Sequence, residues 1–311
     1  MEGILNVLKP PGMTSHDVVD YVRRLTRLRR VGHAGTLDPG AAGVLIVCLG
    51  RATRLARFLH ILDKTYRAEI TFGYRTSTQD VFGRILATSD ASGLTELRVA
   101  SVLPQFLGTI SQVPPMVSAI KYRGKKLYDL ARDGVEVPRA ARQVTICNID
   151  VIGSSGWGSP HPRLVVDIAC SKGTYIRTLC ADIGEALGCG ACLSFLLRLR
   201  VGRFDIRDAY TLEELHELAA TGRLGQAVCS FDEALAHLPP VEVKEAMAER
   251  VLHGQRLTQQ DLCGPIPAYP GELVRLRCKE RLLAVAEVGA APMGIVLSPV
   301  WVNAKPLQMG E

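Results

Sequence analysis

One segment of the chain combines the residue types of a catalytic loop. Residues 32–43 contain four glycines, one proline and a single carboxylate, Asp38. Glycine permits backbone shapes that other residues avoid and lets a ligand approach the chain closely, and Pro39 biases Asp38 away from helical geometry. A lone carboxylate on such a loop can act as a nucleophile or as a general base. Asp38 is therefore the candidate catalytic group.

Three other interpretations of this loop compete with catalysis. Phosphate-binding loops follow G-x-x-x-x-G-K-[ST] or G-x-G-x-x-G, and residues 32–43 contain neither pattern. A glycosidase-like pair needs a second carboxylate, and the sequence does not place Asp63 or Asp80 close to Asp38. Asp-Pro-Gly is also common turn chemistry. From residue types alone, a plain turn remains the main alternative.

The nine cysteines raise the question of disulfides, metal binding or redox chemistry. Their number is odd and no secretion signal accompanies them, so reduced thiols are expected. Cys189 and Cys192 form a C-x-x-C pair, which supplies only two of the four ligands of a structural zinc. We expect no metal site and no redox role.

The elements that must position Asp38 follow from hydrophobic periodicity. Residues 3–8 predict a strand, and Ser15 is a good N-cap for a helix that extends to about residue 28. A glycine-rich loop, 31–43, then leads into an apolar strand at residues 44–49. Asp38 thus lies between a helix and a buried strand, both of which should anchor its loop.

The remaining elements predict an α+β core. Residues 64–72 form the clearest strand, because apolar side chains occupy every second position from Tyr66. A second alternating strand, 164–170, leads into a helix that ends near Gly188. Further elements are helices at 51–60, 95–107 and 212–220, an irregular basic excursion at 111–140, and strands at 273–278 and 282–288. Strands and helices do not alternate regularly, which disfavours a doubly wound sheet.

Composition and charge narrow the class of protein. The chain has 311 residues, 47% hydrophobic and 22% charged, which is typical of a folded globular protein and excludes a disordered or collagen-like one. No stretch approaches the roughly 18 apolar residues of a membrane-spanning helix, and no secretory signal opens the sequence, so a cytoplasmic protein is expected. The net charge is +6, and residues 241–311 carry equal numbers of basic and acidic side chains. The positive excess therefore lies in residues 1–240, where it fits either a polyanion-binding surface or an ordinary solvated basic face, and charge alone does not decide between them.

Six segments, in order, resemble the motifs of the TruB family, the bacterial tRNA pseudouridine-55 synthases. Residues 32–39 (Gly-His-Ala-Gly-Thr-Leu-Asp-Pro) are similar to its active-site motif. The others are Lys9 to Ser15, Asp63 to Tyr66, Asp80 to Gly83, Pro114 to Lys121 and Ser171 to Arg177. Some positions depart from the usual pattern: Gly40 and Ala42 stand where Leu and Thr are more common, and Leu199 follows Arg198 where the family often has Arg-Thr.

The resemblance implies an isomerase that detaches uracil from ribose and reattaches it through carbon, without cofactor or metal. It implies that Asp38 is the essential carboxylate, that Arg177 pairs with it and that Tyr66 stacks on the target base. Whether Asp38 attacks the sugar, attacks the base or removes a sugar proton stays open. From residue types alone, Tyr66 also fits a core tyrosine and Arg177 an ordinary surface arginine.

The resemblance implies further contacts to the substrate. His33 would fill the space left by the flipped nucleotide, and Tyr175 would shape the same pocket. Lys9, Lys64 and Asp80 are also predicted at the substrate site, the two lysines as structural or backbone-contacting groups. The basic segment resembles an inserted RNA clamp, in which the predicted phosphate contacts are Lys121, Arg123, Lys125, Lys126 and Arg132.

The implied architecture has two domains. A pseudouridine-synthase domain, residues 1–238, would contain a mixed, largely antiparallel sheet flanked by helices and the clamp at about 113–140. Residues 239–311 would form a small PUA-like β-barrel for RNA binding. The implied partner is the T-arm stem-loop of tRNA, bound by a monomer that needs no protein partner and no membrane. An RNA-binding or RNA-folding protein without catalysis, and a guide-dependent enzyme acting on ribosomal RNA, are the alternatives.

Overall fold

The larger sheet of the molecule is mixed and largely antiparallel. In the computed structural model, which describes residues 1–118, 120–291 and 294–304, eight strands follow the order β14-β1-β3-β12-β4-β11-β10-β7, with β2 beside β3 and β13 beside β12. Only β3 and β12 run parallel among these pairs. Their bounds are β1 (Gly3–Lys9), β2 (Val31–His33), β3 (Ala42–Leu49), β4 (Lys64–Phe72), β7 (Gly108–Gln112), β10 (Arg142–Ser155), β11 (Arg163–Cys170), β12 (Ala191–Val201), β13 (Phe204–Asp205) and β14 (Val228–Cys229).

Helices cover this sheet in separate groups. The helices are α1 (Ser15–Thr26), α2 (Ala56–Leu59), α3 (Glu96–Val102), α4 (Leu127–Arg132), α5 (Ile176–Ala186), α6 (Leu212–Ala220), α7 (Phe231–Ala234) and α8 (Ala248–Leu252). Helices α3 and α5 pack on β4 and β11 through one apolar cluster. Helices α1 and α6 pack on β1 and β3 through another, and α2 and α7 cover the opposite side of these two strands. The α+β architecture predicted from periodicity is confirmed.

Most sequence-predicted elements occur where expected, with differences that have local causes. Strand β4 spans 64–72 as predicted, and its alternate side chains are buried. Helix α1 is capped by Thr14 instead of Ser15, because Thr14 and Asp17 form a reciprocal capping box. The helix expected at 95–107 ends as α-helix at Val102, since Pro104 cannot continue its hydrogen bonds. The glycine-rich loop contains a short strand, β2, and the long strands β10 and β12 were not predicted.

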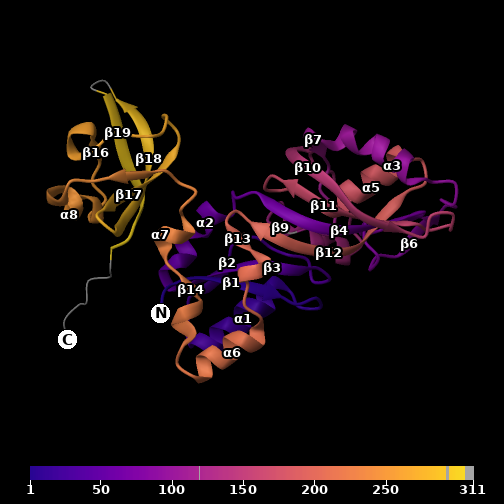
Figure 1. Ribbon diagram of the computed structural model, residues 1–311, viewed down its shortest axis with the longest axis horizontal. Coiled ribbons are helices and arrows are strands. Elements are labelled where there is room, and N and C mark those ends of the chain that lie inside the picture. The colour runs from indigo at the N-terminus through magenta and orange to yellow at the C-terminus, as the bar shows by residue number, and fades with distance from the viewer. Residues whose placement is uncertain (119, 292–293, 305–311) are drawn as a thin grey trace.

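The C-terminal residues form a second, curled sheet beside the first (Figure 1). Its strand order is β15-β17-β18-β19-β16, with β15 (Pro240–Glu242), β16 (Leu257–Thr258), β17 (Leu273–Cys278), β18 (Arg281–Ala291) and β19 (Gly294–Val302). It is held to the larger part by Trp301, whose ring meets Phe231 edge-on at 5.7 Å between centroids, and by Arg275, which donates to the Asp232 carboxylate at 2.7 Å. The curled sheet agrees with the predicted PUA-like module. None of the helices in the described residues has the length and apolarity to span a membrane.

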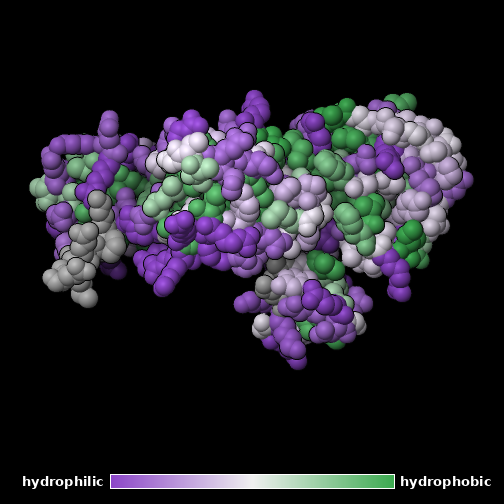
Figure 2. Space-filling model, turned by 90° about the horizontal axis from the view of Figure 1, so that it is seen from below, coloured by the Kyte–Doolittle hydropathy of each residue, from purple (hydrophilic) through white to green (hydrophobic). Residues whose placement is uncertain are grey.

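Residues 120–140 form an excursion from the larger sheet. They contain a hairpin, β8 (Lys121–Tyr122) and β9 (Lys125–Lys126), followed by α4. A mainly hydrophilic lobe projects from the body of the molecule in Figure 2, at the place along the long axis where Figure 1 shows β9. The other two-stranded sheet, β5 (Tyr74–Thr76) with β6 (Ile85–Thr88), carries the turn that contains Asp80.

Candidate active site

Asp38 and Arg177 form an ion pair in the structure. Asp38 lies on the loop between β2 and β3, and Arg177 lies in the first turn of α5. Arg177 Nε stands 2.9 Å from Asp38 Oδ2, with the arginine side chain 4% exposed and the aspartate 45% exposed. A buried guanidinium thus holds a carboxylate that solvent and substrate can still reach. This geometry fixes the direction of the carboxylate.

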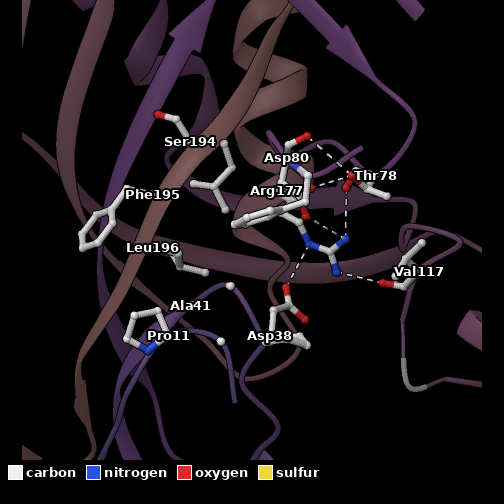
Figure 3. A pocket seen from close by; sticks show the side chains of 15 residues that line it. Pro11, Asp38, Ala41, Thr78, Asp80, Val117, Arg177, Ser194, Phe195 and Leu196 are labelled. Atoms are coloured by element: carbon white, nitrogen blue, oxygen red, sulfur yellow. Dashed lines mark hydrogen bonds and ion pairs between the residues drawn. The ribbon is translucent and has the colours of Figure 1, made fainter. Parts of the chain in front are cut away.

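The other donors of Arg177 are also occupied (Figure 3). Its Nη1 donates to the Thr78 carbonyl at 3.0 Å and its Nη2 to the Val117 carbonyl at 2.8 Å. Asp80 Oδ2 lies 3.7 Å from Nη1, and Asp80 Oδ1 accepts from the Thr78 hydroxyl at 2.6 Å. Asp80 therefore supports Arg177 from the side opposite Asp38. One arginine ties the catalytic loop to two other segments.

Two connected hollows open at Asp38. The smaller is a cavity of about 90 Å³ that Tyr66, Tyr175 and Leu196 line together with Asp38 and Arg177. The larger is a groove of about 630 Å³, whose lining shares Asp38, Arg177 and Leu196 with the cavity. The tyrosine predicted from the β4 pattern is therefore both a core residue, 8% exposed, and a wall of the cavity. A planar ring could be held there against Tyr66 with its edge toward the carboxylate.

The buried side chains of Arg198 and Lys9 hold the backbone of the catalytic loop. Arg198, on β12, is almost fully buried and donates to the carbonyls of Gly35, Thr36 and Val44. Lys9 Nζ donates to the carbonyls of Pro10, Met13 and Pro39, and burial lowers its pKa to about 8. Lys9 is completely buried, so it acts on the backbone and ties Pro10 and Met13 to Pro39, the neighbour of Asp38.

Gly43 is required by the same packing. Its φ is +112°, and a Cβ at this position would lie 2.2 Å from the Arg198 carbonyl oxygen on the parallel neighbour strand. No larger residue fits without moving β3 away from β12. Gly43, at the end of the catalytic loop, therefore allows the close pairing of β3 with β12. This pairing places the Arg198 side chain against the carbonyls of the loop.

Arg198→Met should loosen this loop without removing any group that faces the cavity. Three backbone carbonyls lose their donor, and each unpaired buried acceptor costs about 1–3 kcal/mol when nothing replaces the bond. We expect the free energy of unfolding to fall by about 3 kcal/mol and turnover to fall with it. Urea unfolding checks the first effect. The exposed neighbour on β12, Arg200, provides the control, and an Arg198→Met protein as stable as the Arg200→Met one would contradict this role.

His33 is neutral in the folded protein. It lies on β2, and burial, followed by the nearby His60 and Arg198, lowers its pKa from 6.5 to about 4. Its Nδ1 is buried without a hydrogen-bond partner among the described residues. An uncharged, partly open imidazole suits the predicted stacking role better than an imidazolium would, because no charge must be desolvated.

This depressed pKa predicts a pH dependence of stability. Between about pH 6.5 and 4 the unfolded chain binds a proton at His33 that the folded chain does not. Stability is therefore full above pH 6.5 and falls as the pH drops toward 4. His33→Gln should flatten this decline in the unfolding free energy measured by urea titration at several pH values. His216→Gln, at an exposed position on α6, should leave the slope unchanged; equal slopes for all three proteins would refute the assignment.

The remaining predicted site residues lie outside the two hollows. Lys64 is buried and donates to the carbonyls of His60 and Leu62, so it braces the start of β4. In the excursion the described basic side chains are exposed: Lys121, Arg123, Lys125 and Arg132. The side chain of Lys126 lies outside the described part of the structure. None of these four exposed residues lines the cavity or the groove.

Several residues that build the site were not predicted from the sequence. Leu196 and Arg198 were missed because β12 was not predicted, although its alternation of apolar and basic residues from 197 to 200 was a usable signal. The carbonyls of Thr78 and Val117 left no signal, because any residue type supplies a carbonyl. Burial of Arg177 was likewise not visible in its local sequence.

Comparisons with known proteins decide the family. Residues 23–176 match the model of the TruB family pseudouridylate synthase N-terminal domain, and residues 177–242 match the tRNA pseudouridylate synthase B C-terminal domain. The chain is 52% identical to tRNA pseudouridine synthase B of Pelotomaculum thermopropionicum, over 98% of both chains. It belongs to the TruB family. It is 49% identical to the enzyme of the same name from Moorella thermoacetica, over 92% of this chain and 93% of that one.

Solved structures agree with membership in the TruB family. A crystal structure of a Cbf5-Nop10-Gar1 complex contains a chain that superposes with a TM-score of 0.77 at 28% identity, covering 96% of this chain and 84% of that one. A structure of an H/ACA ribonucleoprotein bound to a substrate RNA gives a TM-score of 0.75 at 26% identity. The predicted pseudouridine-synthase fold is confirmed, and the TruB-family chain is an isomerase that converts uridine to pseudouridine.

Proposed function

We propose that this protein isomerises uridine 55 in the T-arm of tRNA, with Asp38 as the essential carboxylate and without a cofactor. The observation that carries the proposal is the reachable Asp38 carboxylate, held by the buried Arg177 at the mouth of a cavity walled by Tyr66. The relatives at 52% and 49% identity are named tRNA pseudouridine synthases, which favours tRNA as the substrate.

The position of the cavity supports base flipping. The cavity is only about 90 Å³ and opens beside a partly exposed carboxylate, so a base that is still stacked in an RNA helix does not reach it. A uridine must leave the stack to enter, and stacking on Tyr66 offsets part of the lost base stacking. His33 on β2 would take the vacated place in the RNA, and Tyr175 would close the cavity.

Asp38 would then lie near the glycosidic bond of the flipped nucleotide. An ionised carboxylate there can attack the sugar, attack the base or remove a sugar proton. Arg177 keeps the carboxylate aimed, while Arg198 and Lys9 hold the loop backbone. In this proposal these protein groups carry the reaction, without a metal or an organic cofactor.

The outer parts of the chain would hold the rest of the tRNA. The exposed basic residues of the excursion 113–140 suit phosphate contacts, and the PUA-like module from residue 239 onward, next to the 1–238 catalytic domain, adds a second RNA-binding surface. Recognition would rest mainly on the shape of the folded T-arm. We propose that the protein works as a cytoplasmic monomer without a protein partner.

Incubation of the protein alone with an unmodified T-arm stem-loop tests this function. The expected result is one pseudouridine, mapped at position 55, in both the stem-loop and full-length tRNA. No product from either RNA, despite binding, would favour an RNA-binding or RNA-folding protein instead. Product only in ribosomal RNA with added guide components would favour the guide-dependent alternative.

A further inference from the structure

The groove beside Asp38 contains an aromatic side chain that is not packed into a hydrophobic core. Phe82 is 75% exposed and lines the groove, so folding leaves most of its apolar surface in water. Pro11 and the 48%-exposed Phe195 add apolar surface to the groove on the side away from Thr78 and Val117 (Figure 3). An exposed aromatic side chain facing a groove is a feature of binding surfaces.

The backbone that carries Phe82 is fixed. Its N–H donates to Asp80 Oδ1 at 3.0 Å, and the preceding Val81 N–H donates to the Leu193 carbonyl of β12 at 2.9 Å. Leu193 in turn donates to the Gln79 carbonyl at 3.0 Å. The same Asp80 supports Arg177, so the ring is tied to the frame that aims the catalytic carboxylate.

Gly40 makes room for this ring. A Cβ added to Gly40 would lie 2.3 Å from Cε2 of Phe82, 2.8 Å from Cζ and 3.1 Å from Cδ2. These three atoms are consecutive in the ring, so one side of the ring packs against the catalytic loop, while the 75% exposure of Phe82 leaves the rest of the ring available. Gly40 is a position where the sequence departs from the usual family pattern. Its missing Cβ leaves the space that the Phe82 ring occupies.

We propose that Phe82 is a second nucleobase subsite, on which the base next to the target uridine stacks. The proposal rests on the proposed function, because it assumes that a flipped uridine occupies the cavity. The groove and the cavity share Asp38, Arg177 and Leu196, and a neighbouring nucleotide is joined to the target by one phosphodiester. That nucleotide must therefore lie at the entrance of the cavity, where the groove offers apolar walls and a free aromatic face. Stacking on such a face accepts any base.

Kinetics of Phe82 variants on the T-arm stem-loop provide the first test. Phe82→Ala should raise KM about tenfold, within the range of one lost base–aromatic stack, while kcat at saturating RNA changes much less. Phe82→Tyr should restore the wild-type KM, because it keeps the ring. Leu97→Ala removes an apolar side chain that is 84% exposed on α3 and should have no effect. An unchanged KM in Phe82→Ala would overturn the proposal.

Stem-loops that lack a single base identify the stacking partner. An abasic site directly 5′ or 3′ of the target should weaken binding to the wild-type protein about as much as Phe82→Ala does, and should cost the Phe82→Ala protein nothing further. Independent losses at both neighbours would show that neither base meets the ring and would overturn the proposal. Gly40→Ala, which must push the ring aside, should add nothing to the effect of Phe82→Ala in the double variant.

A binding measurement separates this inference from the proposed function. In the Asp38→Asn protein, 2-aminopurine beside the target should change fluorescence on binding, and Phe82→Ala should remove much of that change. This readout needs no turnover, so it tests the subsite even if the wild-type protein forms no pseudouridine. Turnover by the wild type with identical fluorescence in both proteins would leave the function standing and reject the subsite.

Discussion

Asp38→Asn is expected to abolish pseudouridine formation. The substitution keeps the size of the side chain and an oxygen that can accept from Arg177, but it removes the negative charge and the basic, nucleophilic oxygen. A positioned carboxylate contributes about 10²–10⁴-fold as a general base, and more as a nucleophile. We therefore expect turnover on the T-arm stem-loop to fall by at least about 10³-fold, measured under single-turnover conditions.

RNA affinity distinguishes a catalytic effect from a folding effect. Asp38 is 45% exposed, so the variant should remain folded and bind the stem-loop nearly as tightly as the wild type. Asp208→Asn, at an exposed position far along the sequence, provides a matched loss of one carboxylate and should keep full activity. Full turnover by Asp38→Asn would show that another group carries the reaction.

Arg177→Met should remove both activity and a large part of the stability. The variant leaves Asp80 and the carbonyls of Thr78 and Val117 without their shared donor, and it leaves Asp38 without a partner. The two carbonyls and the 16%-exposed Asp80 lose the donor they share, at about 1–3 kcal/mol for each buried acceptor left unpaired, or at least about 3 kcal/mol together. We expect the free energy of unfolding to fall by about that amount, measured by urea titration, and no detectable product.

Two further variants separate charge from geometry at Arg177. Arg177→Lys keeps the charge but replaces the planar fork by one ammonium group, which cannot reach Asp38 and both carbonyls together. It should be more stable than Arg177→Met and still at least about tenfold less active, as expected when a bidentate arginine site loses its geometry. Arg75→Met breaks an exposed pair with Glu185 and should change the free energy of unfolding far less, because exposed ion pairs contribute little. Similar losses of unfolding free energy in Arg177→Met and Arg75→Met would contradict the inference that burial makes the Arg177 contacts important for stability.

The local sequence determined the elements and the candidate chemistry. Alternation located β4 because one side of a half-buried strand must be apolar, and that pattern placed Tyr66 on the buried face. The glycines and proline around Asp38 marked an irregular loop because their backbone preferences are intrinsic. The ordered motifs then assigned the family, which the matches to known proteins confirmed. These signals are local or additive, so a single chain is enough to detect them.

Only the tertiary structure decided how the site is held together. Asp38 meets Arg177 from 139 positions away, and Arg198 reaches the carbonyls of the catalytic loop across the one parallel strand pair of the larger sheet. The Phe82 ring rests on Gly40 for the same kind of reason. Such contacts depend on chain topology and on backbone carbonyls, which every residue type provides. The sequence therefore indicated which groups perform the chemistry, and the fold determined what aims them.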